Sequence, residues 1–163
     1  MIADRHVFDA CVKTPFATIG IVADDKHLLG LHFLPTSVAA KPPKTNTIAH
    51  LACVQVMAYL DNPRIRFEVP LKLNGTKHQI DVWEGMRRIP AGGTMTYGEL
   101  ADAIGSSARA VGTACGQNPI PLIVPCHRIV AANGTLGGFM GGKLENPLAI
   151  KHWLLKHEGA LLL

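Results

Sequence analysis

The stretch Asn118-Pro-Ile-Pro-Leu-Ile-Val-Pro-Cys-His-Arg-Ile-Val130 combines three prolines, a run of apolar residues and an adjacent cysteine and histidine. Proline fixes the backbone angle φ and cannot donate a backbone hydrogen bond, so the segment is unsuited to a helix interior or a central strand. Its apolar side chains predict that it is buried. We therefore expect a stiff, buried arm that holds Cys126 in one position, as a thiol used in chemistry requires.

Two short helices are predicted immediately before this arm. Thr96-Tyr-Gly-Glu99 has the spacing of a capping box, and the helix that it begins ends at Gly105. Ser106 or Ser107 caps a second helix that runs to about Gln117. Two short helices joined through a glycine-containing turn are typical of a helix-turn-helix. The alternative for the second helix, which is rich in small residues, is tight packing within the protein.

The sequence after the arm predicts a β-hairpin. Asn133-Gly134 is typical of a two-residue β-hairpin, and a hairpin that follows a helix-turn-helix is called a wing. A glycine-rich loop occupies residues 137–142. Asn146-Pro147 then has the pattern of an N-cap followed by proline at the first helical position. We expect the last helix to run from there to His157 or Glu158.

The first part of the chain has a different pattern. Residues 7–12, 19–23 and 28–34 read as antiparallel strands, and residues 47–60 carry an apolar stripe at helical spacing. From about residue 79 the pattern changes to short helices, the first over residues 79–88. We therefore predict two domains, residues 1–78 and residues 79–163.

Composition narrows the class of protein. The chain has 163 residues, of which 48% are hydrophobic, so it can bury a core and is unlike a disordered protein. Its apolar runs are too short to cross a membrane, and no signal peptide is visible at the N-terminus. These features predict an intracellular, cytoplasmic protein. The net charge of +4 permits contact with a polyanion but also fits an ordinary basic surface.

The four cysteines, Cys11, Cys53, Cys115 and Cys126, are not closely spaced, which argues against a zinc site. An intracellular setting disfavours disulfides, so we expect free thiols. Cys53 and Cys115 share apolar helix faces with other core positions and are expected in the core. Cys126 is left as the most plausible nucleophile. We predict no metal and no cofactor.

Several motifs together carry a resemblance to a known family. They are Ile89-Pro-Ala-Gly92, Thr96-Tyr-Gly-Glu-Leu-Ala101, Arg109-Ala-Val-Gly112, Asn118-Pro119, Pro125-Cys-His-Arg128, the glycine-rich loop and Lys151-His-Trp-Leu-Leu-Lys-His-Glu158. In these motifs residues 79–163 resemble the O6-alkylguanine-DNA alkyltransferases, also called methylated-DNA–protein-cysteine methyltransferases. The resemblance implies an α+β fold, with a small ribonuclease-H-like β-sheet and helix domain before a winged helix-turn-helix domain. Residues 1–78 fit the family only in length and in the order of strands and helix.

The resemblance implies direct-reversal DNA repair. Cys126 would accept the alkyl group from the O6 atom of guanine in one irreversible displacement, so each molecule acts once. His127 would remove the thiol proton through a bound water, and Glu158 would orient the imidazole. Asn118 would hold the turn around the nucleophile.

The resemblance also implies the substrate contacts. The partner is double-stranded DNA containing O6-alkylguanine, bound from the minor groove by a monomer, with clustering along DNA left open. The target base would be flipped out of the helix. The base pocket would be formed by Tyr97, which hydrogen-bonds the base, with Val124, Phe139, Met140 and Lys151. The DNA contacts would come from Arg109, which fills the gap left by the flipped base, and from Thr96, Ala108, Thr113 and Arg128.

Some of these assignments have alternatives. Tyr97 shares a helix face with apolar residues and could be a core residue, Glu158 could be a solvated helix end, and Arg128 could be structural. Phe139 and Met140 stand where many family members have Tyr and Ser, so the preferred alkyl group could differ. If His127 and Glu158 activate the thiol, we expect the pKa of Cys126 below its free value.

Two other functions remain open at this point. A protein that binds alkylated DNA without repairing it would need no reactive cysteine, so Cys126 argues against that function. A winged-helix transcription regulator would read base edges and follow sequence rather than damage.

Overall fold

The computed structural model describes residues 7–142 and 144–161, and the chain divides into two units, one ending at Leu73 and the other beginning at Asn74. The division falls in the polar Asn74-Gly75 segment. The domain boundary expected after residue 78 lies five residues later, inside helix α2 (Lys77–Arg87). The helix starts early because Thr76 caps it, with the Thr76 side chain accepting a hydrogen bond from the Gln79 amide.

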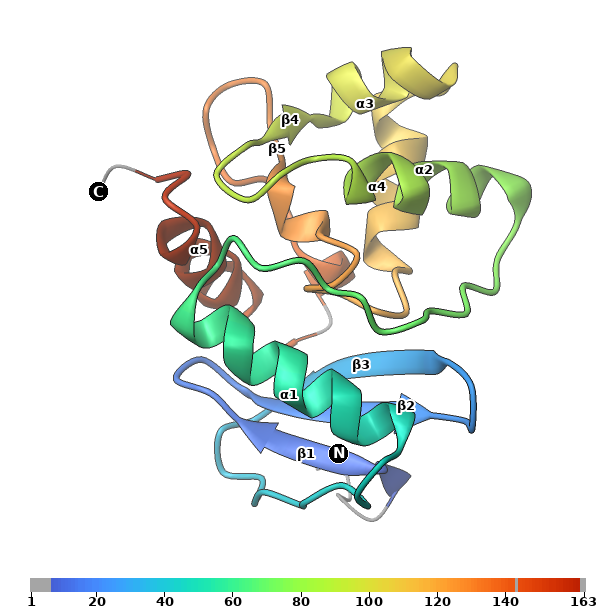
Figure 1. Ribbon diagram of the computed structural model, residues 1–163. Helices are drawn as coiled ribbons and strands as arrows, with labels where there is room; N and C mark the ends of the chain where they lie inside the picture. Colours follow the sequence, from blue (N-terminus) through green and yellow to red (C-terminus); the bar gives the residue numbers. More distant parts are fainter. Residues whose placement is uncertain (1–6, 143, 162–163) are drawn as a thin grey trace. The chain divides into compact units, whose positions relative to one another are not determined.

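The first unit is a three-stranded antiparallel sheet with one helix packed on it (Figure 1). The strands β1 (Ala10–Lys13), β2 (Thr18–Ala23) and β3 (Leu28–Leu34) pair in chain order, and α1 (Ile48–Asp61) follows. The predicted order of three strands and then a helix is confirmed. Cys53 is buried on α1, which confirms its expected place in the core. The narrower ribonuclease-H-like assignment stays a prediction.

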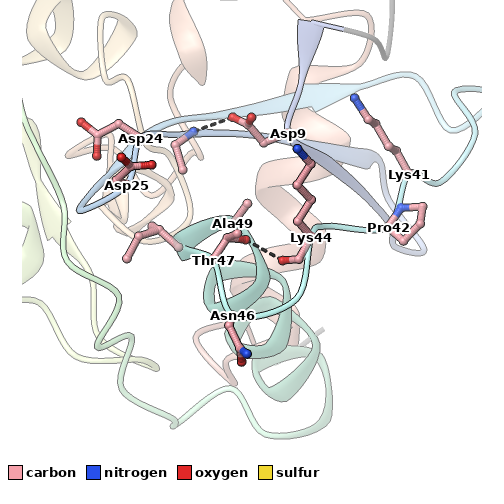
Figure 2. A pocket seen from close by; sticks show the side chains of 11 residues that line it. Asp9, Asp24, Asp25, Lys41, Pro42, Lys44, Asn46, Thr47 and Ala49 are labelled. Atoms are coloured by element: carbon pink, nitrogen blue, oxygen red, sulfur yellow. Dashed lines mark hydrogen bonds between the residues drawn. The ribbon is translucent and has the colours of Figure 1, made fainter.

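A cleft of about 560 Å³ lies in the first unit beside the start of α1. Figure 2 shows Asp24 and Asp25 at the turn after β2, and Lys44 on the loop that leads into the helix. The Thr47 hydroxyl donates to the Lys44 carbonyl at 2.7 Å and accepts from the His50 amide at 3.1 Å, so it caps α1 and fixes the rim of the cleft. The predicted site residues do not line this cleft.

The second unit begins with three helices that pack on one another: α2, α3 (Tyr97–Ile104) and α4 (Ala108–Gly116) (Figure 1). The buried Trp83 of α2 donates its indole N–H to the Ala114 carbonyl of α4 at 2.9 Å. The predicted Thr96–Glu99 capping box is confirmed at the start of α3. Gly105 ends α3 with φ of 70°, a left-handed conformation that favours glycine, and Ser107 caps α4.

The predicted hairpin after the arm is wrong. Strand β5 (Ile129–Val130) pairs in parallel with β4 (Met95–Thr96), and within the described ranges no strand returns to it after residue 130. Asn133-Gly134 does make a turn, because the Ala131 amide donates to the Thr135 carbonyl at 3.2 Å. Asn133-Gly134 correctly indicated a turn, which depends only on neighbouring residues. The strand that pairs with β5 is β4, which lies more than 30 residues earlier in the chain and gave no signal in this segment.

The remaining elements lie within the arm or follow it in the chain. A short 3-10 helix, η2 (Cys126–Arg128), precedes β5, and a second one, η3 (Met140–Gly142), lies in the glycine-rich loop. The last helix of the described chain is α5 (Pro147–His157). Pro147 occupies the first turn of α5 as expected. In the part of the chain that the structure describes, no helix is long and apolar enough to span a membrane.

Candidate active site

The arm of residues 118–130 is folded around Asn118, which is buried. The Asn118 side-chain amide donates to the Val124 carbonyl at 2.8 Å, and its oxygen accepts from the Ile120 amide at 3.0 Å. Between these contacts the chain turns sharply, with Leu122 at φ of 75°. A side chain that bonds both ends of a loop fixes the loop, as expected for Asn118.

Proline then turns the chain into the reactive segment. Pro125 has φ of −84° and ψ of 68°, close to the angles of an inverse γ-turn, and the Cys126 amide donates across it to the Val124 carbonyl at 2.8 Å. The Arg128 amide donates to the Pro125 carbonyl at 3.0 Å, which starts η2. The turn therefore presents Cys126 and His127 from one rigid segment, and both side chains are buried, at 4% and 0% exposure.

A buried carboxylate connects this segment to α5. Glu158, at 2% exposure, lies 2.8 Å from His127 Nε2 through Oε2, and it accepts from Arg128 Nε through Oε1 at 2.8 Å. Burial alone would raise the pKa of Glu158, but the hydrogen bonds from His127 and Arg128 outweigh burial and hold that pKa at about 2. Glu158 is therefore an anion, and the alternative of a solvated helix end is wrong.

The anion determines the form of the histidine. A carboxylate only accepts hydrogen bonds, so Nε2 of His127 carries a proton and Nδ1 is left with its lone pair. Nδ1 is buried and has no hydrogen-bond partner among the described residues. Burial lowers the pKa of His127 below its ordinary value, although Glu158 opposes the shift. The result is a neutral imidazole beside Cys126 with a bare nitrogen, which is the form of a general base.

Cys126 forms part of the wall of a pocket of about 250 Å³. The other side chains that line it are those of Tyr97, Cys115, Phe139 and Met140, together with several glycines. The pocket thus brings Tyr97, Phe139 and Met140, which the resemblance assigned to one base pocket, into the same pocket as the thiol.

Tyr97 lines this pocket, and its hydroxyl donates to the Gly138 carbonyl at 3.4 Å. Burial raises the pKa of Tyr97, so the hydroxyl keeps its proton and remains a donor. A side chain at Gly137 would collide with the Tyr97 ring, since a Cβ atom there would lie 2.9 Å from it, and φ of 74° also favours glycine. Tyr97 is therefore a wall of the pocket and more than a core residue.

Lys151 does not reach the pocket, although the sequence placed it among the substrate contacts. Its ammonium group is fully buried and donates to the carbonyls of Ile129, Leu136 and Gly138, the last at 2.8 Å. All three of its donor hydrogens are used in this way. Burial lowers the pKa of Lys151 to about 8. The residue therefore acts as a clamp that ties β5 and the glycine-rich loop to α5.

The predicted roles of Val124 and Arg128 also need correction. Val124 is fully buried and absent from the pocket lining, because its carbonyl is fixed by Asn118 and its side chain lies in the core. Arg128, predicted to contact DNA, places its guanidinium on both oxygens of Glu158 and on the Ile89 carbonyl. Its side chain is 12% exposed, which supports the structural alternative.

The remaining predicted DNA contacts lie at the two neighbouring helices α3 and α4. Ala108, Arg109 and Thr113 are exposed on one side of α4, where the Thr113 hydroxyl donates to the Arg109 carbonyl at 3.2 Å. Thr96 is half-buried, and its hydroxyl is occupied as the cap of α3. Arg109 is thus an exposed cation on α4.

Sequence reasoning did not place the residues of α4 in the pocket, among them Cys115 and Gly116. Cys115 is buried as expected, at 7% exposure, but it also lines the pocket. Gly116 lets the glycine-rich loop approach α4, because a Cβ atom there would lie 3.2 Å from backbone atoms of Gly141. The small residues noted along this helix were a signal for close approach, although the partner is the chain's own loop.

The thiol itself is not activated in the resting protein. Burial raises the pKa of Cys126 to about 11, and a hydrogen bond from Asn118 and the charge of Lys151 offset this only partly. The expectation of a pKa below the free value is therefore wrong for the protein without DNA. The physical reason is that the enclosed site disfavours a thiolate more strongly than its neighbours stabilise one.

Comparison with known proteins gives consistent matches. Residues 77–160 match the family model described as 6-O-methylguanine DNA methyltransferase, DNA binding domain. A methylated-DNA–protein-cysteine methyltransferase of Methanosarcina acetivorans is 36% identical over 160 residues, which cover 94% of this chain and 99% of the relative. One from Shigella flexneri is 48% identical over 97 residues, covering 58% of this chain and 54% of the relative. The match therefore spans only about half the length of the Shigella relative.

The structure also resembles solved ones. A crystal structure of Mycobacterium tuberculosis OGT in complex with DNA has a TM-score of 0.77 and is 35% identical, covering 92% of this chain and 91% of that one. That degree of similarity extends the likeness beyond the segment matched by the family model.

Replacing Glu158 by Gln should destabilise the protein. Removing one partner of a buried ion pair leaves Arg128 without a counter-charge, and we expect a loss of about 3 kcal/mol in the free energy of unfolding at pH 7. Because the folded pKa of Glu158 is lowered from 4.5 to about 2, its contribution is present above pH 4.5 and disappears as the pH falls towards 2.

Urea denaturation at pH 7 and at pH 3 measures this effect, with Glu145→Gln at an exposed position as the control. The gap between wild type and Glu158→Gln should narrow at pH 3. A gap that stayed constant between the two pH values would contradict the ionised pair.

The raised pKa of Cys126 predicts a pH profile. Only the thiolate attacks electrophiles, so without DNA the rate of Cys126 alkylation by iodoacetamide should keep rising towards pH 11, by about tenfold per pH unit. Peptide mass spectrometry resolves Cys126 from the other thiols. Glutathione serves as a solvent-exposed reference thiol. A plateau for Cys126 below the ordinary thiol pKa of about 8.5 would show that the resting thiol is activated.

Proposed function

The chain belongs to the O6-methylguanine-DNA methyltransferase family, and we propose that it repairs DNA by transferring the alkyl group of O6-alkylguanine to Cys126. The observation that carries the proposal is the geometry around the thiol. Cys126 lies in the wall of a small pocket, and the next residue is a neutral histidine oriented by a buried carboxylate. This is the order of nucleophile, base and orienting group found in covalent catalysis.

Deprotonation of the thiol is the first task of the site. A pKa of about 11 means that almost no thiolate exists at neutral pH, so the proton must leave as the reaction proceeds. His127 Nδ1 is the nitrogen with a free lone pair, and a water bridging it to the thiol would carry the proton. Glu158 then stabilises the imidazolium, because it is already an anion 2.8 Å from Nε2.

The displacement itself moves the alkyl carbon from oxygen to sulfur. The Cys126 sulfur forms a bond to that carbon, the bond from carbon to O6 breaks, and the electron pair stays on the guanine. Tyr97 supports the departure, because its protonated hydroxyl lies in the same pocket and can donate to the base. The product is a thioether, whose carbon–sulfur bond is not readily hydrolysed, so each molecule removes one alkyl group.

Access to the alkyl group requires DNA binding by α3 and α4. We assign these helices to a helix-turn-helix, joined by Gly105 and two serines, with the exposed face of α4 against the minor groove. Small side chains such as Ala108 allow close approach, and Arg109 can fill the gap left by the flipped base. Rotating the base out costs a few kcal/mol, which a stacked guanidinium partly offsets.

Intact-mass measurement after mixing with duplex DNA that contains O6-methylguanine tests the function. We expect each molecule to gain one methyl group on Cys126 and then to stop. Cys126→Ala should abolish transfer but still bind the damaged duplex, whereas Cys53→Ser should transfer normally. Sustained turnover, or methylation on another cysteine, would overturn the proposal. Damage-specific binding by the wild type without any transfer would indicate a non-enzymatic binder.

Replacing Arg109 by Ala tests base flipping. We expect methyl transfer from duplex DNA to slow by about tenfold or more, because a stabilising contact of roughly 1.4 kcal/mol or more is lost. Transfer from free O6-methylguanine base, which needs no flipping, should change little. Lys156→Ala, which removes an exposed cation on α5, is the control for a general loss of positive charge. Equal slowing with both substrates would place Arg109 in the pocket chemistry instead.

A further inference from the structure

The Met140 side chain contacts the sulfur atom of Cys126. The Cys126 thiol donates a hydrogen bond to the Met140 thioether, with 3.6 Å between the two sulfur atoms. At that separation the atoms are in van der Waals contact, so no alkyl carbon fits between them. The Met140 side chain therefore covers one side of the nucleophile, within the same pocket that the alkyl group must enter.

The backbone around Met140 is held in place on both sides. Lys151 donates to the Gly138 carbonyl, and the loop at Gly141 lies so close to α4 that Gly116 cannot carry a side chain without a shift. Phe139 is buried at 3% exposure and anchors the loop between these points. Met140 itself has φ of 53°, an uncommon conformation for a residue with a side chain. The backbone is thus fixed, and the flexible methionine side chain is the part that can yield.

We propose that Met140 is a specificity-determining residue that caps the Cys126 sulfur and restricts alkyl transfer in favour of small groups. This inference rests on the proposed function and assigns its substrate class: O6-methylguanine in preference to guanines with a bulky O6 group such as benzyl. A methyl carbon needs only a small displacement of the thioether. A benzyl group requires the Met140 side chain to move out of most of the space that it occupies in a pocket of about 250 Å³.

Two properties of methionine could produce the effect, and they are separable. Its volume blocks the approach to Cys126, and its sulfur accepts the thiol hydrogen. Leucine has a similar volume but cannot accept a hydrogen bond, whereas alanine removes both the volume and the acceptor. If volume is the cause, Met140→Leu keeps the preference for methyl and Met140→Ala loses it.

The experiment measures second-order rate constants for transfer to Cys126 from one duplex sequence that carries either O6-methylguanine or O6-benzylguanine. The measured quantity is the ratio of the benzyl rate to the methyl rate. We expect Met140→Ala to raise this ratio by about tenfold or more over wild type, a typical discrimination by pocket size. Met140→Leu should stay within about threefold of the wild-type ratio, which is less than 1 kcal/mol.

Further variants keep the test decisive. Met140→Gly suits a backbone with positive φ and replaces the alanine variant if that one does not fold. Met57→Ala, at an exposed position on α1, should leave the ratio unchanged. An unchanged ratio in the alanine or glycine variant would overturn the role of Met140, and an equal rise in Met140→Leu would overturn its volume as the cause of the preference. Absence of methyl transfer by the wild type would instead reject the proposed function.

Discussion

The buried carboxylate of Glu158 is the interaction on which the candidate site depends. One side chain accepts hydrogen bonds from both His127 and Arg128, which are neighbours in η2. Its charge sets which nitrogen of His127 holds the proton, and its two oxygens are satisfied in a place that water does not reach. Without that anion, the imidazole would have no fixed tautomer and Arg128 would be a half-buried cation without a counter-charge. The carboxylate of Glu158 therefore both orients the His127 imidazole and stabilises the fold.

Two fixed points hold the pocket around this pair. Asn118 closes the arm behind Cys126 through two backbone contacts, and Lys151 ties β5 and the start of the glycine-rich loop to α5 through three carbonyls. Both use a buried polar group to satisfy buried backbone atoms, which would otherwise be costly to leave unpaired. The pocket can therefore remain open between rigid walls, with Met140 as the adaptable part. A thiol in this enclosure is neutral at rest, and in the proposed mechanism it would lose its proton to His127.

Local signals could be predicted well from the sequence. The Thr96–Glu99 capping box, the Gly105 helix end and the core position of Cys53 depend on residues a few positions apart, and the structure confirms them. The hairpin at Asn133-Gly134 was wrong because strand pairing is decided by a partner far along the chain.

Long-range polar contacts could not be predicted from pattern alone. Arg128 and Lys151 are long cations, and most such residues lie at the surface, so nothing in their spacing indicated burial. Their partners, Glu158 and three carbonyls, come together only in the folded unit. The prediction of a lowered pKa for Cys126 was wrong for a related reason. The resemblance indicated which residues surround the thiol but not how deeply the thiol is buried. The pairing of His127 with Glu158 was expected from the resemblance, and its geometry comes from the structure.

The separation of 31 residues between His127 and Glu158 has a consequence for biosynthesis. A growing polypeptide contains the nucleophile and its base well before it contains the carboxylate that orients them. Until α5 has been made and has docked, His127 has no fixed tautomer, Arg128 has no counter-ion and the Lys151 clamp does not exist. An unfinished chain therefore carries an ordinary cysteine, and the reactive arrangement arises only when the end of the second unit is in place. The fold must therefore be complete before the thiol is in the arrangement that the proposed transfer requires.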